Sequence, residues 1–558
     1  MLKNWKLRLG WTALGAALAT VGCFDFDKTL DECKKNGTCG QGGILPDGGL
    51  PDGGRPCDFI SNEDLPDDEG IDANCDGVDG IAALGLFVDP VAGTNGATGT
   101  PTDPLKTLSE AFQKMQSPEN AGRSVLYLAQ GTYAEANLEL TRPISLYGQY
   151  GGKAGNWDRP FQSPSLVSGG TVALKVRDLQ QDAGVVLERL HILAANAAGP
   201  SEASIALHVI NSQGVRLHRT ILEAGRGGAG DGGLPGNGGL NGVDGGGGSS
   251  PLNGSNAGEG GLAPRFECRS QDRSGGSGQN GGGYNGAGLT GEEGRPSTLG
   301  GDGGMLGTAR LVSGTYDCRG EELNGLIGLT GAPGSPGGAG DGGSGLGELR
   351  NGLWVATHHG AAGIPGEAGA GGGGGGSGGG CQASAGKIAA AGAGSGAGGS
   401  GGCGGEAGQG GGAGGASIAL VLEAADVQFS HVTLRTRGGG AGGAGGAGGD
   451  GGVGGFGGQG ANGVLVSGTY GSSNTPYSSI GGNGAAGGHG GHGGPGGPGG
   501  GGGGGPSVGI WCGANATYSV LPSETLMTEL ANGGPGGASP GRQGTEGSKL
   551  LQVNCPNP

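Results

Sequence analysis

The feature that most constrains the fold of this chain is its glycine, which supplies 151 of the 558 residues and is concentrated in long tracts. Ordinary usage is about 7%, so much of the chain has too few side chains to build a hydrophobic core. Within the tracts, glycine follows a period of three. From Gly439 the chain repeats two glycines and then one variable residue. The variable residues are Ala441, Ala444, Ala447, Asp450, Val453, Phe456 and Gln459.

A period of three matches an extended helix of the polyproline II type, which has three residues per turn. One face would carry the variable side chains, and the other two would be bare backbone that can bond to neighbouring segments. Ordering glycine loses much conformational entropy, so only several packed segments would be stable. Disorder is the main alternative, and collagen is disfavoured because proline is sparse in the triplets. Trp354, Tyr316 and Phe266 favour a folded, polyglycine-II-like bundle.

Outside the tracts, short segments alternate apolar and polar residues, as β-strands do. Three segments in order resemble the N-terminal part of pectate-lyase-like proteins. They are Phe87-Val88, then Pro104-Leu105-Lys106-Thr107-Leu108 at the start of a helical pattern, and then 127–133. We expect Asp103 to cap this helix and Pro104 to lie in its first turn. The resemblance implies a mainly β fold, a right-handed parallel β-helix (solenoid) with an N-terminal capping helix and long glycine-rich insertions.

An internal repeat supports insertions rather than separate domains. Its copies begin at Ser204, Ser417 and Ser507, and each runs on into a glycine tract. The tracts, over residues 225–545, resemble PGRS-type glycine-rich repeat proteins in composition. The predicted divisions are a signal peptide (1–22), an acidic tether (23–80), the first part of the β-helix (81–224), an insertion (225–416), a coil (417–437), a second insertion (438–506) and a C-terminal coil and tail (507–558).

The N-terminus has the pattern of an export signal. Lys3, Lys6 and Arg8 precede an apolar run over 9–21 that is too short to span a bilayer. The following Thr20-Val21-Gly22-Cys23 resembles the lipobox of bacterial lipoproteins, which implies cleavage and lipidation at Cys23. An ordinary signal peptide is the alternative. Phe24 rather than Asp follows Cys23, so we expect a lipid-anchored, surface-exposed protein of the outer membrane.

Ten further cysteines remain, an even number that suggests disulfides in an exported chain. They are Cys33, Cys39, Cys57, Cys75, Cys268, Cys318, Cys381, Cys403, Cys512 and Cys555. The simplest pairing is sequential, 33–39, 57–75, 268–318, 381–403 and 512–555, because each pair lies within one segment. A zinc site is disfavoured because no Cys-x-x-Cys pair occurs.

A candidate metal loop lies at Asp72, Asn74, Asp76 and Asp79, with Gly77 available for a sharp turn. Oxygen ligands at alternate positions match the first half of a calcium loop, and the stretch resembles thrombospondin-type calcium repeats. Calcium is therefore the cofactor we expect, in a role that stiffens the tether. A solvated acidic turn is the alternative.

The formal net charge of −17 disfavours nucleic acid as a partner. We expect a surface-anchored structural or adhesive protein whose partners are the membrane, through the lipid on Cys23, and an extracellular polysaccharide or other cell-surface ligand. The alternative is a polysaccharide lyase or hydrolase, which needs clustered carboxylates. The carboxylates here are scattered, and Asp182, Glu188 and Arg189 are the nominees for that chemistry.

Overall fold

The computed structural model describes residues 57–159, 163–179, 184–252, 256–350, 352–382 and 389–556. Its contacts divide the chain into two compact units, Met1–Phe59 and Ile60–Pro558. The second unit holds every helix and strand discussed below. Among the described residues, no helix has both the length and the apolar character that crossing a bilayer requires.

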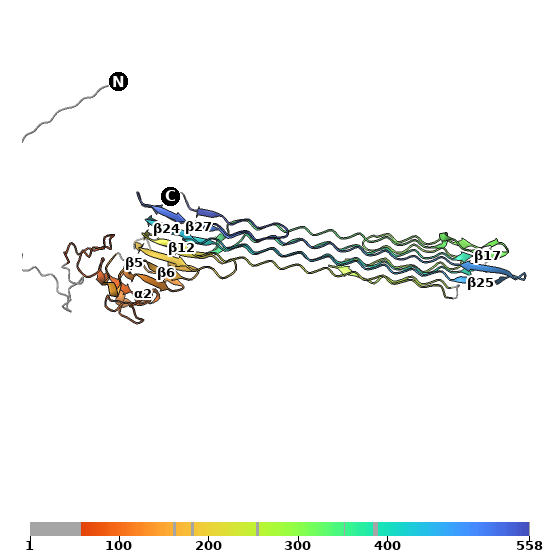
Figure 1. The fold of residues 1–558 in the computed structure, drawn as a ribbon, viewed down its shortest axis with the longest axis horizontal. Coiled ribbons are helices and arrows are strands. Elements are labelled where there is room, and N and C mark those ends of the chain that lie inside the picture. Colours follow the sequence, from red (N-terminus) through yellow and green to blue (C-terminus); the bar gives the residue numbers. More distant parts are fainter. Residues whose placement is uncertain are drawn as a thin grey trace, which may run out of the picture. The chain divides into compact units, whose positions relative to one another are not determined.

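Three large parallel sheets lie in Ile60–Pro558 (Figure 1). Sheet 1 has the order β1 (Gly85–Val88), β2 (Val125–Ala129), β5 (Ser145–Tyr150), β8 (Val185–Glu188), β11 (Val215–His218), β23 (Asp426–Ser430), β28 (Thr517–Val520). Sheet 2 has the order β30 (Lys549–Val553), β27 (Ser507–Cys512), β22 (Ser417–Glu423), β10 (Ser204–Ile210), β7 (Val172–Arg177), β4 (Leu138–Leu140). Sheet 3 has the order β29 (Leu526–Glu529), β24 (Val432–Thr436), β12 (Ile221–Ala224), β9 (Leu190–Ala194), β6 (Ser165–Gly169), β3 (Gly131–Ala134).

Four small sheets complete the strands. They are β13 (Glu267–Cys268) with β14 (Gln271–Asp272); β15 (Gly307–Thr308), β20 (Cys381–Gln382) and β21 (Ala389–Ala390); β16 (Arg310–Val312), β17 (Thr315–Cys318), β26 (Thr475–Ile480) and β25 (Leu465–Tyr470); and β18 (Glu348–Arg350) with β19 (Leu353–Val355). Short 3-10 turns occur at η2 (Ala82–Leu84), η3 (Pro118–Asn120), η4 (Lys153–Gly155) and η5 (Glu321–Leu323).

The three copies of the internal repeat lie side by side in sheet 2. Ser204 pairs with Ser417, and Ser417 pairs with Ser507, so the copies share one register. The chain leaves β12 at Ala224 and returns to β22 at Ser417, and it leaves β24 at Thr436 and returns to β27 at Ser507. The long glycine tracts therefore start and end at neighbouring strands.

The main core lies between the large sheets and includes the single α-helix of the described residues, α2 (Leu108–Met115). Its apolar residues Leu108, Ala111, Phe112 and Met115 are all buried. The helix begins later than predicted, because the Thr107 side chain accepts the Glu110 N–H as the N-cap. Asp103 instead accepts from Thr98, so its predicted capping role is wrong.

The prediction of one right-handed parallel β-helix is wrong. The described strands form seven sheets, of which three are large and parallel, and not a single solenoid. Alternating apolar residues show where a chain is extended and which side chains are buried. They do not show which strands are joined by hydrogen bonds into one sheet. Only a few per cent of the described residues are helical.

The glycine tracts form a bundle of extended segments that run side by side from the large sheets to the small sheet that contains β17 and β25 (Figure 1). We call this part the glycine bundle. Its backbone hydrogen bonds recur every third residue. Along segment 227–248, for example, the N–H groups of Gly230, Gly233, Gly236, Gly239, Gly242, Gly245 and Gly248 donate to carbonyls of segment 438–459, also three residues apart.

In the middle of the bundle, successive residues bond to different neighbours. The N–H groups of Gly372, Gly373 and Gly374 donate to the carbonyls of Gly399, Leu329 and Glu292, which belong to three different segments. A Cβ on Gly374 would lie 2.1 Å from the carbonyl oxygen of Ser277. Unbroken glycine runs therefore occupy the centre, where every face of a segment meets backbone, and triplets with one side chain occupy the periphery.

Candidate functional site

Two neighbouring peripheral segments of the glycine bundle carry exposed apolar side chains. These side chains are 43–69% exposed, and they are Leu234, Leu240, Val243, Val453 and Phe456. We refer to this set as the apolar face. Exposed apolar side chains are unremarkable singly, and these five are of interest because an ordered backbone carries them.

Backbone bonds hold the apolar face in place. The carbonyls of Val453 and Phe456 accept the N–H groups of Gly242 and Gly245, at 2.7 and 2.8 Å. The N–H of Val453 donates to the side chain of Asn241, and that of Phe456 to the side chain of Asp244, at 2.8 and 2.7 Å. Both residues therefore have a bonded N–H and C=O, so their side chains project from a fixed backbone.

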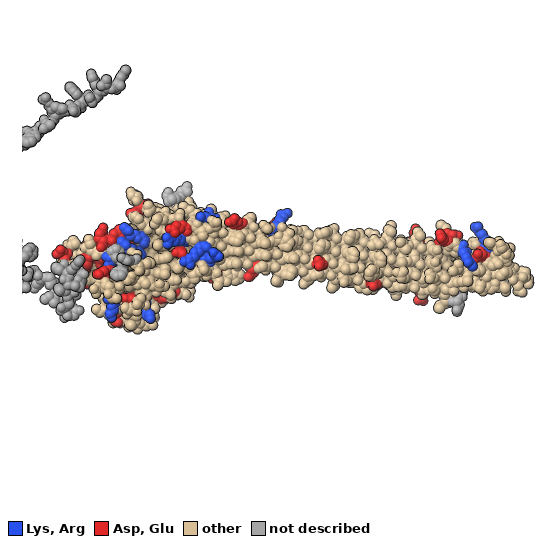
Figure 2. Space-filling view, viewed as in Figure 1, with Lys and Arg blue, Asp and Glu red and all other residues tan. Residues whose placement is uncertain are grey.

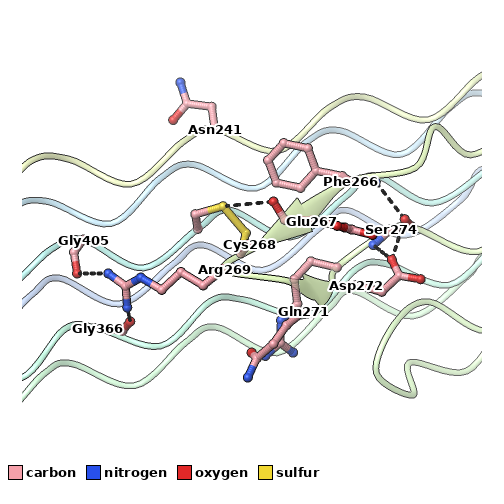
Figure 3. The surroundings of a disulfide bond; sticks show 12 residues. Asn241, Phe266, Glu267, Cys268, Arg269, Gln271, Asp272, Ser274, Gly366 and Gly405 are labelled. Carbon is pink, nitrogen blue, oxygen red and sulfur yellow. Dashed lines mark hydrogen bonds between the residues drawn. A yellow bond between two sulfur atoms is a disulfide. The ribbon is translucent and has the colours of Figure 1, made fainter.

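A disulfide-linked hairpin interrupts the bundle beside this region (Figure 3). Cys268 of β13 is bonded to Cys403, and Figure 3 shows the Arg269 side chain extending to the carbonyls of Gly366 and Gly405, both at 3.3 Å. Arg269 and Ser270 form the tight turn between β13 and β14 with φ values of 48° and 64°. A pocket of about 480 Å³ opens next to the hairpin, and its lining includes Arg269, Arg273, Pro365 and Glu367.

Charged side chains gather over the large sheets and are sparse on the glycine bundle (Figure 2). Arg159 pairs with Asp79 and Glu188, and all three side chains are buried. Burial raises the pKa of Asp79 to about 7, against the opposing effect of Arg159. Asp68 pairs with Arg189 and Arg219. Residues 64–79, predicted as part of a tether, thus contact sheet 1 and the loops that follow its strands.

The predicted calcium residues do not point to a common centre. Asp72 and Asn74 accept the backbone N–H of Asp76, and Asp76 accepts that of Ala82. Asp79 is turned to Arg159 and to the N–H of Asp67. Within the described ranges, no group of three or more His, Cys, Asp or Glu residues is arranged to hold a metal. A calcium site stays a prediction.

Two of the disulfides differ from the sequential pairing. Cys268 is bonded to Cys403 and Cys318 to Cys381, so the predicted 268–318 and 381–403 pairs are wrong. Cys512 is bonded to Cys555, as predicted. Cys57 and Cys75 are each disulfide-bonded. Cys23, Cys33 and Cys39 lie outside the described residues.

Of the two nominated carboxylates, the structure describes Glu188, which has a basic partner, as do two other carboxylates of the large sheets. Glu188 bonds to Arg159, Glu223 to Arg437 and His191, and Glu423 lies 3.3 Å from His208. Arg189 is paired with Asp68, and Asp182 lies outside the described residues. These contacts give each of the three carboxylates a basic partner.

Comparison with known proteins gives no relative: no family model matches the chain, and neither a curated protein nor a solved structure is significantly similar to it.

Proposed function

We propose that this chain is a structural or adhesive protein of the cell surface, held at the outer membrane by a lipid on Cys23, that binds carbohydrate, matrix or another cell-surface ligand along the glycine bundle. The observation that carries this proposal is the bonding of the central glycine segments on all sides by backbone of other segments. Such a bundle resists bending, because displacing one segment breaks hydrogen bonds to several neighbours at once.

Rigidity makes the bundle a suitable support for a binding surface. A ligand that binds to preorganised side chains loses less free energy to ordering the protein than one that binds to a flexible loop. The apolar face supplies exposed hydrophobic contact area, and few charged side chains lie on the bundle (Figure 2). Adhesion by many weak contacts along an extended surface is the mode that this arrangement favours.

Adhesion of cells that display the full chain tests the proposal. The double variant Leu240→Ser/Phe456→Ser is expected to reduce adhesion to glycan-coated or matrix-coated surfaces at least fivefold, with unchanged amounts of protein on the surface. The control is Ala444→Ser/Ala447→Ser, which alters two exposed residues of the same segment as Phe456. Equal adhesion by both double variants and the natural chain would overturn the role of the apolar face.

The anchor is tested separately. Cys23→Ser removes the acceptor of the lipid, so the variant is expected to leave the membrane fraction for the soluble fraction. Metabolic labelling with a fatty-acid analogue reports the lipid directly. A Cys23→Ser variant that still carries label and stays with the membrane would overturn the anchoring.

A further inference from the structure

The backbone N–H groups on one side of segment 391–415 form a regular series with a gap. At one end, those of Ser395, Gly398 and Gly401 donate to carbonyls of segment 273–279, at 3.1, 2.8 and 2.9 Å. At the other end, the N–H of Ala413 donates to Nδ1 of His359 at 3.0 Å. Between them, Gly404, Ala407 and Gly410 have N–H groups with no hydrogen-bond partner in the part of the chain that the structure describes.

The neighbouring segment 360–380 shows the matching gap in its carbonyls. Those of Gly372 and Gly378 accept N–H groups from Gly276 and Gly282. Further along the same segment, the carbonyl of Gly366 accepts from Arg269, and those of Gly360 and Gly363 accept no hydrogen bond from any described residue. We call the strip between Gly404–Gly410 and Gly360–Gly366 the open row.

The hairpin explains why the open row is empty of protein. Farther from the large sheets, segment 274–282 lies between segments 391–415 and 360–380 and bonds to both. Nearer the large sheets this position is not filled, because residues 265–273 form β13 and β14 instead. The Cys268–Cys403 disulfide fixes the hairpin at this end of the row. The 480 Å³ pocket opens at the same place, and both Gly366 and Gly404 line it. Gly404 is buried, whereas Ala407 and Gly410 are half-buried.

The spacing of the free N–H groups selects the chemistry of a ligand. Residues three apart in an extended segment of this period are about 9 Å apart, so a ligand must present acceptors at that repeat. A peptide backbone in the same extended conformation does so, as segment 274–282 demonstrates. A Cβ on Gly275, Gly278 or Gly281 would lie 1.9–2.2 Å from a carbonyl oxygen of segment 391–415. A peptide in the row therefore needs glycine at every third position.

We propose that the open row binds an extended peptide with glycine at every third position, added antiparallel to segment 391–415 as residues 274–282 are. The inference depends on the hydrogen-bonding pattern and not on the lipid anchor. It gives the adhesive role a protein partner in addition to the glycans considered above. Peptide binding is measured on the purified chain, so its outcome is independent of the adhesion assay.

The test uses a fluorescent peptide with the sequence of residues 274–282. A control peptide carries alanine at the positions of Gly275, Gly278 and Gly281. The glycine peptide is expected to bind and to slow hydrogen exchange over 404–410, and the alanine peptide to do neither. Equal binding of both peptides would overturn the proposal. So would protection of 404–410 by oligosaccharides but not by the peptide, or protection in the free chain through self-association.

A matched pair of variants localises the site. Ala407→Pro removes the central N–H of the row, and Pro is compatible with extended backbone. Losing one hydrogen bond is expected to weaken peptide binding about fivefold. Ala444→Pro makes the same change in a Gly-Gly-Ala triplet of segment 438–459. The N–H of Ala444 bonds to no described residue and lies outside the open row, so this variant is expected to leave the affinity for the peptide unchanged. Unchanged exchange of 274–282 verifies folding. Equal affinities of the two variants would place binding elsewhere and overturn the proposal.

Discussion

Nη1 of Arg159 lies 3.2 Å from Oδ2 of Asp79, and both side chains are almost completely buried. The same guanidinium bonds to Glu188 at the end of β8 and stacks over the ring of Tyr150, 5.0 Å from its centroid. The Tyr150 hydroxyl donates to the Asp79 carbonyl at 2.6 Å. Arg159 therefore attaches the acidic segment before β1 to sheet 1 through a buried charge network.

Asp79→Asn should change how stability depends on pH. Burial raises the pKa of Asp79 from 3.8 to about 7 in the folded chain. Between about pH 4 and pH 7 the folded state therefore binds a proton that the unfolded state has released, so stability falls as pH rises through this window. Asparagine does not titrate, and the variant should lose less stability than the natural chain between pH 4.5 and 7.5. Urea unfolding followed by circular dichroism measures the difference.

Asp178→Asn is the control for this measurement. Asn211 and Arg177 hold the pKa of the exposed Asp178 below its ordinary value, so any stability that it contributes is lost below about pH 4. Its variant should show the same slope as the natural chain from pH 4.5 to 7.5. The same slope in Asp79→Asn as well would contradict a raised pKa at Asp79.

Arg159→Leu should be more destabilising than either change. It leaves Asp79 and Glu188 buried without a cationic partner, which typically lowers the free energy of unfolding by about 3–5 kcal/mol. The loss should be smaller at pH 5, where Asp79 is protonated. Arg159→Lys retains the charge but not the fork of donors, and an intermediate loss is expected. Denaturant titration at both pH values gives the comparison, and a pH-independent loss would argue against this mechanism.

The sequence predicted features that depend on local pattern. The copies at Ser204, Ser417 and Ser507 were recognisable as repeats, and they lie in register in sheet 2. The three-residue period of the tracts recurs as the spacing of backbone bonds. In both cases the pattern extends over many residues, and each repeat makes contacts equivalent to those of the next.

Features that depend on distant contacts were missed. Cys268 lies beside Cys403 because the tract folds back on itself, so the nearest cysteine in sequence is not the nearest in space. Arg159 and Asp79 are 80 residues apart, and no sequence pattern relates them. The number of sheets was also missed, because alternation of apolar residues does not specify which strands share hydrogen bonds. The open row depends on where one hairpin leaves the bundle.

Removing the Cys268–Cys403 disulfide should loosen the glycine bundle. The bond closes a loop of 135 residues, for which removal typically lowers the free energy of unfolding by about 2–5 kcal/mol. In Cys268→Ser/Cys403→Ser, amide exchange is expected to speed up in 265–282 and 391–405. The Cys512→Ser/Cys555→Ser variant opens a loop of 43 residues joining β27 to the C-terminal end of β30. It should lower stability without faster exchange in those segments, and identical exchange maps for the two variants would rule out a local role.

Gly374→Ala should destabilise the chain by about 1–3 kcal/mol, the usual range for overpacking. The added Cβ would meet the Ser277 carbonyl oxygen at 2.1 Å, and Gly374 also donates to Glu292 and accepts from Gly301. No flexible side chain is present to move aside, so a backbone segment must shift and its hydrogen bonds must lengthen.

Gly283→Ala is the matched control, because nothing lies within 4 Å of its Cβ position. Its guanidinium unfolding midpoint should stay within experimental error of the natural chain or rise slightly, since alanine restricts the unfolded chain. If Gly374→Ala unfolds at the same midpoint as Gly283→Ala, the centre of the bundle has room for side chains, and close backbone packing does not explain its unbroken glycine.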